Sequence, residues 1–334
     1  MEDILEDTTK YTKKVETLEL QLCPELVEEN YLTNLANTLI DIRKKIFDTY
    51  GVPLPPIKIT CSDTEFTNQK IQIKIFITGY CIREIIKKEK QSQIPGIIYN
   101  SIKHNLPRCI TATTIEKFYD EVQKDNSTLI TTLRSFTNSY AAVRRVLKEL
   151  IAEYIPIRNL PLIFESILEC YAQYDINYIS YWRLLDAARM ELAPVFITEL
   201  LNSNREFICF NVSKEINSYF EYNSNDNCEE GFMKSFIEEI GKILKGNPNV
   251  ALVLDLNDER RHYYHYILKP FFPDLRVIKK SELTKAKDFS PLSIRVIKTI
   301  DTPIPKKEES AISRPPEKKF SSIRKRIEKI LKKK

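Results

Sequence analysis

Two helical patterns meet at a short polar corner near the middle of the chain. Apolar residues recur at helical spacing on both sides of it, at Val143, Leu147, Leu150 and Ile151 before it and at Leu160, Ile163, Phe164, Ile167 and Leu168 after it. The corner itself is Ile155–Asn159. Because proline disfavours a helical conformation in the residue before it, Pro156 predicts that the first helix ends near Tyr154. Asn159 can cap the second helix, and Pro161 then falls in its first turn. The pattern alone predicts a helix–turn–helix in a helical core.

The chain before this region alternates between strand and helix patterns. Strict apolar–polar alternation indicates strands, a 3.6-residue period indicates helices, and glycine or proline separates them. The expected elements are a strand over Val15–Leu22, a helix over Glu25–Tyr50 ended by Gly51, strands near 57–59 and over Ile71–Ile77, and a helix over Thr113–Lys124 capped by Thr113 or Thr114.

Four helical patterns follow, at 128–136, 140–154, 159–173 and 177–201. The chain then returns to alternating strands and helices. The expected elements are strands over Phe207–Phe210, Val250–Leu254, Arg276–Ile278 and Leu292–Ile297, and helices starting at Ser213 and spanning Glu229–Leu244 and Asp258–Leu268, with a polar loop over Asn223–Cys228.

We therefore predict an α+β protein with several subdomains. An N-terminal α/β subdomain precedes a central all-α helical subdomain, a small C-terminal α/β subdomain and a basic helical tail. The predicted boundaries are a linker at 1–14, the N-terminal subdomain at 15–126, the helical subdomain at 127–203, the C-terminal subdomain at 204–300, and a disordered basic tail at 301–334 with an amphipathic helix at 317–334.

Charge is concentrated in the tail. Residues 301–334 carry twelve Lys or Arg and five Asp or Glu, a balance of +7, so the other 300 residues carry −2 of the total of +5. Phe320, Ile323, Ile327, Ile330 and Leu331 share one face of the helix expected there. Such a helix is either a solvated surface element or a contact to an anionic membrane or acidic partner. The candidate binding residues are Lys318, Lys319, Arg324, Lys325, Arg326 and Lys329.

Composition narrows the classes of function. Of the 334 residues, 43% are hydrophobic and 29% are charged, as in soluble globular proteins. The sequence has neither a long apolar stretch nor a signal-peptide pattern, and its seven cysteines are scattered, which indicates reduced thiols in a cytosolic protein. Only six glycines are present, and none of the glycine motifs of phosphate loops or nucleophile elbows occurs. We therefore expect no enzyme activity, no cofactor and no catalytic residues.

One weak pattern for metal binding remains. Glu259, His262 and His265 can share a helix face, but two histidines at this spacing without a second ligand motif more often have structural roles. We predict no metal site.

The amino-acid sequence in and around the corner resembles that of the cytoplasmic domain of the type III secretion export gate, the FlhA/SctV or FHIPEP family. The family usually has Ser where Pro156 stands. The residues that carry the resemblance are Leu147, Leu150, Glu153, Ile157, Arg158, Asn159, Leu160, Ile163 and Glu165.

Flanking motifs agree with the family in order, from about residue 15 to residue 300. On the N-terminal side, the family's helix ends in Gly and continues into a Pro-Pro-Ile-basic-Ile strand, as at Gly51 to Ile59. Asn68 and Gly79 also fit, whereas Lys70 stands where Tyr is common. The C-terminal matches are Asp175, Asp186, Arg189 and Leu192, followed by Pro273, Asp274, Leu275, Val277 and Ile278 and then by Ser281, Glu282 and Leu283.

The chain departs from the family between the first sheet and the helices. There the family has an inserted α/β subdomain of about fifty residues, and this chain has only residues 87–107. We infer that the inserted subdomain is reduced to a loop or lost. Part of the family's site for chaperone–substrate complexes lies on it, so none of those positions is transferred to this chain.

The resemblance implies a non-enzymatic docking platform for protein transport in a flagellar export apparatus or an injectisome. It implies a homo-oligomer, a nonameric ring, at the cytoplasmic face of the bacterial inner membrane. Its partners would be secretion chaperone–substrate complexes, the export ATPase stalk and the membrane half of the export gate. Candidate residues for the oligomer or partner interface are Glu153, Arg158, Asn159 and Arg189.

Two alternatives stay open. In the first alternative, Arg158 and Arg189 have no interface role and are surface arginines that pair with a nearby carboxylate such as Glu153 or Glu165. Such an exposed pair contributes little to stability. In the second alternative, the chain is not part of an export gate but a helical adaptor, which its basic tail recruits to anionic membrane or nucleic acid.

Overall fold

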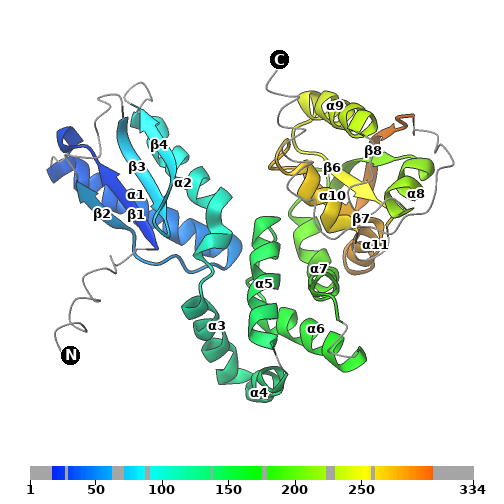
Figure 1. The fold of residues 1–334 in the computed structure, drawn as a ribbon, viewed down its shortest axis with the longest axis horizontal. Coiled ribbons are helices and arrows are strands. Elements are labelled where there is room, and N and C mark those ends of the chain that lie inside the picture. Colours follow the sequence, from blue (N-terminus) through cyan, green and yellow to red (C-terminus); the bar gives the residue numbers. More distant parts are fainter. Residues whose placement is uncertain are drawn as a thin grey trace, which may run out of the picture. The chain divides into compact units, whose positions relative to one another are not determined.

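The computed structural model describes residues 17–26, 29–61, 71–86, 91–136, 138–174, 179–222, 230–256 and 260–303. The chain forms two compact units, residues 1–168 and residues 169–334. Each unit contains a four-stranded sheet with helices around it (Figure 1). The predicted α+β class is confirmed. The predicted subdomain boundaries stay predictions, and the linker at 1–14 and the helix at 317–334 lie outside the described residues.

The sheet of the first unit has the strand order β2-β1-β3-β4. The central strand β1 (Leu18–Leu22) pairs in parallel with β2 (Lys58–Cys61) and antiparallel with β3 (Ile71–Ile77). A two-residue turn at Thr78 and Gly79, both with positive φ, leads into β4 (Tyr80–Ile86), as in tight hairpins. Alternation of side chains then gives the sheet a buried apolar face, formed by Leu18, Leu20, Leu22, Ile73, Ile75 and Ile77.

Two helices of this unit pack against each other, α1 (Glu29–Tyr50) and α2 (Ile94–Asn105), and α2 also contacts β3 and β4. The expectation from the resemblance that the inserted subdomain is reduced to a loop at 87–107 is wrong for the residues of α2. Ile94, Ile98 and Ile102 recur every fourth residue and are all buried, so a narrow apolar stripe holds an otherwise polar helix in place.

Four further helices follow: α3 (Ala112–Asp125), α4 (Ser127–Ser135), α5 (Ser139–Ala152) and α6 (Leu160–Gln173). The predicted cap of α3 is wrong by two or three residues, because Thr111 occupies that position. The backbone N–H of Thr114 donates to Thr111 Oγ1 at 3.3 Å, and the N–H of Thr111 donates to Thr114 Oγ1 at 3.3 Å. This reciprocal pair satisfies two N–H groups that a helix start otherwise leaves open.

The second unit is built on a parallel sheet with the order β7-β6-β5-β8. Parallel strands require crossover connections, which the helices of this unit supply. The four strands are β5 (Glu206–Val212), β6 (Ala251–Leu254), β7 (Arg276–Lys279) and β8 (Ser293–Ile300). The helices are α7 (Tyr181–Thr198), α8 (Lys214–Tyr222), α9 (Glu230–Gly246), α10 (Arg261–Leu268) and α11 (Lys280–Phe289).

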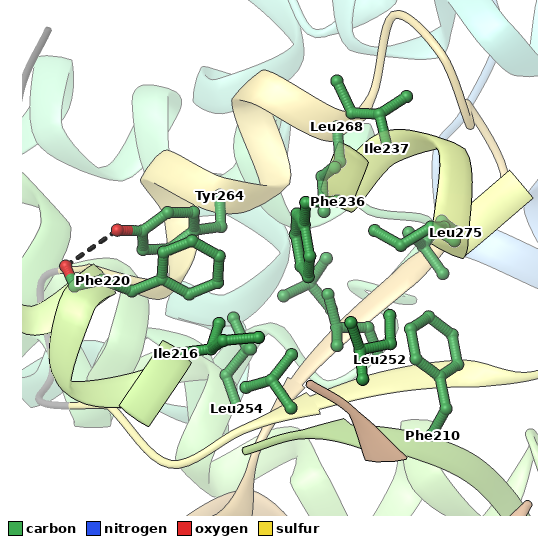
Figure 2. Packing of buried hydrophobic residues seen from close by; sticks show 14 of the residues in the cluster. Phe210, Ile216, Phe220, Phe236, Ile237, Leu252, Leu254, Tyr264, Leu268 and Leu275 are labelled. Carbon is green, nitrogen blue, oxygen red and sulfur yellow. Dashed lines mark hydrogen bonds between the residues drawn. The ribbon is translucent and has the colours of Figure 1, made fainter. Parts of the chain in front are cut away.

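Aromatic and branched side chains form the core of this unit (Figure 2). The ring of Phe220 of α8 packs against two others, with centroids 5.1 Å from Phe236 of α9 and 3.9 Å from Tyr264 of α10. The Tyr264 hydroxyl donates to the Phe220 carbonyl at 2.7 Å, so the one polar atom of that ring is satisfied inside the core. Burial of these apolar side chains is the main driving force for folding of the unit.

The sequence reading missed α11, which packs on α7. Its residues Lys280–Phe289 are mostly polar, and only Glu282, Leu283 and Ala286 are buried. No helix in the described ranges combines the length and the hydropathy that a membrane span requires.

Candidate assembly and docking site

The residue just before the corner is in the left-handed conformation. Tyr154 has φ of 57°, its N–H donates to Ile151 O at 2.9 Å, and the N–H of Ile155 donates to Leu150 O at 2.8 Å. These two bonds form a Schellman motif, which closes the end of α5. Glycine usually takes this position. Here aromatic packing holds Tyr154, whose ring centroid lies 6.5 Å from that of Tyr50 and which Lys103 Nζ approaches at 4.5 Å.

The corner docks on the end of α1. The N–H of Ile157 donates to Tyr50 O at 2.9 Å, and Arg158 Nη1 donates to Asp48 O at 3.1 Å. Both acceptors are carbonyls in the last turn of α1, where a positive charge is favourable. Gly51 allows this approach, because a Cβ added there would lie 2.9 Å from Arg158 N. Asp48 and Arg158 are 110 positions apart in the sequence. Their contact therefore joins α1, beside the first sheet, to the helices that flank the corner.

Asn159 caps α6, as predicted. The N–H of Leu162 donates to Asn159 Oδ1 at 3.2 Å. Arg158 and Asn159 are exposed, whereas Glu153 is buried. Of the residues predicted to meet a partner on this unit, Arg158 and Asn159 therefore present their side chains at the surface of a single chain.

Arg189, the fourth predicted interface residue, belongs to the second unit and is 1% exposed. Its guanidinium forms a two-pronged contact with Glu282 of α11, with Nε to Oε1 at 2.7 Å and Nη2 to Oε2 at 2.9 Å. Glu282 Oε2 also accepts from the N–H of Lys279 at 2.8 Å. The alternative of a surface arginine is therefore wrong for Arg189, because the pair is enclosed. Its role at a partner interface stays a prediction.

Three further charged side chains surround this pair. Asp186 lies one turn before Arg189 on α7, with Oδ1 at 3.9 Å from Arg261 Nε and Oδ2 at 3.7 Å from Lys279 Nζ. Arg189 and Arg261 both donate to the carbonyl of Val277 on β7, at 3.4 and 3.3 Å. We call these five buried residues the ionic cluster: Asp186, Arg189, Arg261, Lys279 and Glu282. It connects α7 to α10, β7 and α11.

Within the ionic cluster, Asp186 is the weakly held member. Its Oδ2 makes no hydrogen bond to any described residue. Burial raises the pKa of Asp186 to about 7, and the nearby Arg261 and Lys279 oppose this shift only in part. A carboxyl in this position changes its charge near neutral pH.

The raised pKa predicts a specific dependence of stability on pH. Between about pH 4 and pH 7, folded Asp186 holds a proton that the unfolded chain has released, so this group stabilises the fold less as the pH rises. Asp186→Asn removes the effect. Relative to the parent, the free energy of unfolding of this variant should rise by about 1 kcal/mol per pH unit between pH 5 and pH 7, because the folded carboxyl has lost half of its proton by pH 7. Urea unfolding of both proteins across this range measures the difference, and parallel profiles would contradict the assignment.

The sequence reading missed Arg261, Lys279 and Glu282 as partners. The sequence contained a hint of part of the ionic cluster, because Asp186 and Arg189 lie on an otherwise apolar stretch of α7. The apolar neighbours are Leu184, Leu185, Ala188 and Leu192, and all are buried. Charges inside an apolar helix face require buried partners. Arg261 lies 75 residues from Asp186, and Glu282 lies 93 residues from Arg189, so no local pattern points to these partners.

The remaining candidates are less informative. The six basic residues of the tail and Glu259 lie outside the described ranges. His262 stacks on Trp182 with ring centroids 3.4 Å apart, and His265 is buried. Among the described residues, no group of three potential ligands has the geometry to hold a metal ion.

Comparison with known proteins places the chain in a family. Over residues 83–288, more than half of its length, the sequence matches the FHIPEP family. It is 24% identical over 245 residues to the flagellar biosynthesis protein FlhA of Buchnera aphidicola. That alignment covers 65% of this chain and 33% of FlhA, so the chain spans about a third of that relative's length.

Solved structures share the fold. Nonameric SctV-C of EPEC superposes with a TM-score of 0.70 at 15% identity, covering 86% of this chain and 99% of that one. The CdsV protein of Chlamydia pneumoniae, solved in complex with CdsO, gives 0.65 at 12% identity, covering 88% and 100%. Sequence match and fold agree on the resemblance carried by the corner. The chain belongs to the FHIPEP family of export-gate proteins, which are not enzymes, and it has the fold of the C-terminal domain of SctV.

Proposed function

We propose that the chain is the cytoplasmic part of a type III protein export gate and acts as a ring-forming docking platform. The observation that carries this proposal is the FHIPEP match over residues 83–288 together with a fold that covers 99% of the SctV C-terminal domain. That relative forms a nonameric ring, and CdsV, of the same fold, binds CdsO. By resemblance, this chain forms a nonamer, receives chaperone–substrate complexes and contacts the export ATPase stalk.

The surface of the corner supports a role in assembly. Arg158 and Asn159 are exposed, and the hydrogen bonds of the corner to α1 and α6 fix their positions. A side chain held in this way loses less conformational entropy when a partner binds. We assign Arg158 and Asn159 to the ring interface. Glu153 and Arg189 are buried in the single chain, so their proposed role at the interface is to support the neighbouring surface.

Location and cargo follow from the same proposal. The platform lies at the cytoplasmic face of the bacterial inner membrane, below the membrane half of the gate. The family's inserted subdomain is reduced in this chain, so the docking of chaperone–substrate complexes relies on other surfaces. The basic tail, with Lys318, Lys319, Arg324, Lys325, Arg326 and Lys329, adds contact to anionic lipid.

Deletion of residues 317–334 tests this division of roles. A secretion chaperone–substrate complex from the same bacterium should bind the full chain and the deletion variant with equal affinity in biolayer interferometry. Vesicles that contain phosphatidylglycerol should bind only the full chain, because electrostatic attraction to anionic lipid is lost with the tail.

The alternative function, an adaptor recruited by its basic tail, rests on the +7 balance of residues 301–334. It predicts loss of every binding activity on deletion of the tail, including binding to single-stranded oligonucleotides. Chaperone complexes that bind neither form of the protein would contradict the proposed docking function.

A further inference from the structure

A shallow hollow of about 480 Å³ lies in the second unit where β8 begins. It opens between the turn before β5 and the loop that joins α11 to β8. Its lining residues are Asn204, Arg205, Lys287, Pro291, Leu292 and Ser293. All the segments that form it are described, so its walls and its charge are known.

One wall of the hollow is rigid and strained. Arg205 has φ of 57°, a conformation that residues other than glycine rarely adopt. Asn202 Oδ1 holds the turn by accepting the N–H groups of Asn204 and Glu206, both at 2.9 Å. The guanidinium of Arg205 reaches across the loop, and Nη2 donates to Ser290 Oγ at 2.6 Å. Strain that local hydrogen bonds maintain in this way often marks a binding site.

The hollow is positively charged. Arg205 and Lys287 line it, and Arg295 is exposed two residues beyond Ser293. None of these three cations forms an ion pair with a carboxylate in the part of the chain that the structure describes. The acceptors of Arg205 Nη2 are neutral, the Ser290 hydroxyl and the Pro291 carbonyl. Two carboxylates lie close by but do not line the hollow: Asp288 is exposed, and Glu206, the strand partner of Ser293, accepts from Asn202 Nδ2 at 3.0 Å. The charge therefore favours an anionic ligand.

An unpaired strand edge runs from the hollow. β8 is the last strand of its sheet and pairs only with β5 among the described strands. Its register shifts between the pairs Cys209–Val296 and Phe210–Lys298, so a bulge at Ile297 limits the regular edge to residues 293–296. Phe289, 71% exposed, and Val296, 45% exposed, place apolar surface beside this edge.

We infer that this surface binds a short, extended, acidic segment of a partner protein. The segment adds to the edge of β8 over residues 293–296, which supplies backbone hydrogen bonds. Its acidic side chains pair with Arg205, Lys287 and Arg295, and an apolar side chain covers Phe289. Charge, a free edge and exposed apolar side chains occur together at this place. The inference does not depend on ring formation.

A labelled peptide tests the inference on the full chain. The probe is the acidic heptapeptide VEIDVTI, acetylated, amidated and carrying fluorescein, and its basic counterpart VKIKVTI is the control. Fluorescence anisotropy should show saturable binding of the acidic peptide, weaker at high salt. Hydrogen exchange should show new protection confined to β8 and the turn before β5.

Two variants locate the site. Arg205→Gly removes a cation and suits the positive φ, so it should fold and bind the peptide at least about tenfold more weakly. Lys287→Glu should weaken binding to a similar degree. Lys245→Glu, an exposed change of the same charge on α9, should leave affinity unchanged. Absence of saturable binding, equal affinity for the two peptides, or equal loss in the Lys245 variant would each overturn the inference.

Discussion

Replacing Glu282 with Ala should lower the free energy of unfolding by about 3–5 kcal/mol, measured by urea unfolding at pH 7. Glu282 accepts two hydrogen bonds from Arg189 and one from the N–H of Lys279, at 2.7 to 2.9 Å, and none of its surface is exposed. The variant leaves Arg189 buried with its paired carboxylate removed, beside Arg261 and Lys279. Removal of one partner from a buried pair costs far more than the net strength of the pair.

Two controls separate this explanation from general damage to the fold. Lys280 lies on α11, the helix of Glu282, and forms an exposed ion pair with Asp255. Lys280→Ala breaks only this pair and should leave the unfolding midpoint unchanged. The double variant Arg189→Met with Glu282→Met removes both charges and should recover much of the lost stability. A Glu282→Ala variant as stable as the parent, or a double variant less stable than the single one, would contradict the assignment.

Gly51→Ala should also be strongly destabilising, by about 2–4 kcal/mol in the free energy of unfolding. Gly51 has φ of +76°, and an added Cβ would lie 2.9 Å from the backbone N and 3.0 Å from the Cα of Arg158. Backbone atoms cannot rotate away from the new methyl group. The corner must then withdraw from α1, which weakens the bonds of Ile157 to Tyr50 and of Arg158 to Asp48. Chemical denaturation of the full chain measures the loss.

A second glycine provides the matched control. Gly96 lies in the first turn of α2, and a Cβ there would have no neighbour within 4 Å. Gly96→Ala should therefore be neutral or stabilise the protein by up to about 1 kcal/mol. If the two alanine variants have equal stabilities, close contact between the corner and α1 is not the reason for glycine at position 51.

Much of the fold follows from local sequence pattern. The helices on both sides of the corner, the end of α1 at Gly51 and the cap at Asn159 all lie where apolar spacing, proline and asparagine predict them. β3 spans Ile71–Ile77, as its alternation predicts. These features depend on neighbours within a few residues, so one sequence is enough to identify them.

The elements that were missed have weak local signals. α2 buries only three isoleucines among polar residues, and α11 buries Leu283 and Ala286 with one carboxylate. Their positions depend on surfaces that other segments supply. The ionic cluster is the extreme case, because Arg189 and Glu282 are 93 residues apart and come together only through the fold of the second unit. A surface arginine and a buried one look alike in the sequence.

Two sets of contacts hold neighbouring elements together, the corner in the first unit and the ionic cluster in the second. In the first unit the corner fixes the sheet region to the helices, and in the second the ionic cluster fixes α7 to the sheet. The proposed docking function would benefit from such rigidity, because partners would then meet preorganised surfaces. The variants at Gly51 and Glu282 therefore offer a way to reduce partner binding without any change to the surface itself.

Assembly of this chain into the ring of an export gate can be read from its mass in solution. Mass photometry of lightly cross-linked protein, after assembly at high concentration, measures the size of the particles. We expect a species of about 350 kDa, which corresponds to nine copies of the 39.2 kDa chain as in the nonameric relative, and we expect Arg158→Glu to abolish it. Particles of 39.2 kDa alone at every concentration would contradict this assembly.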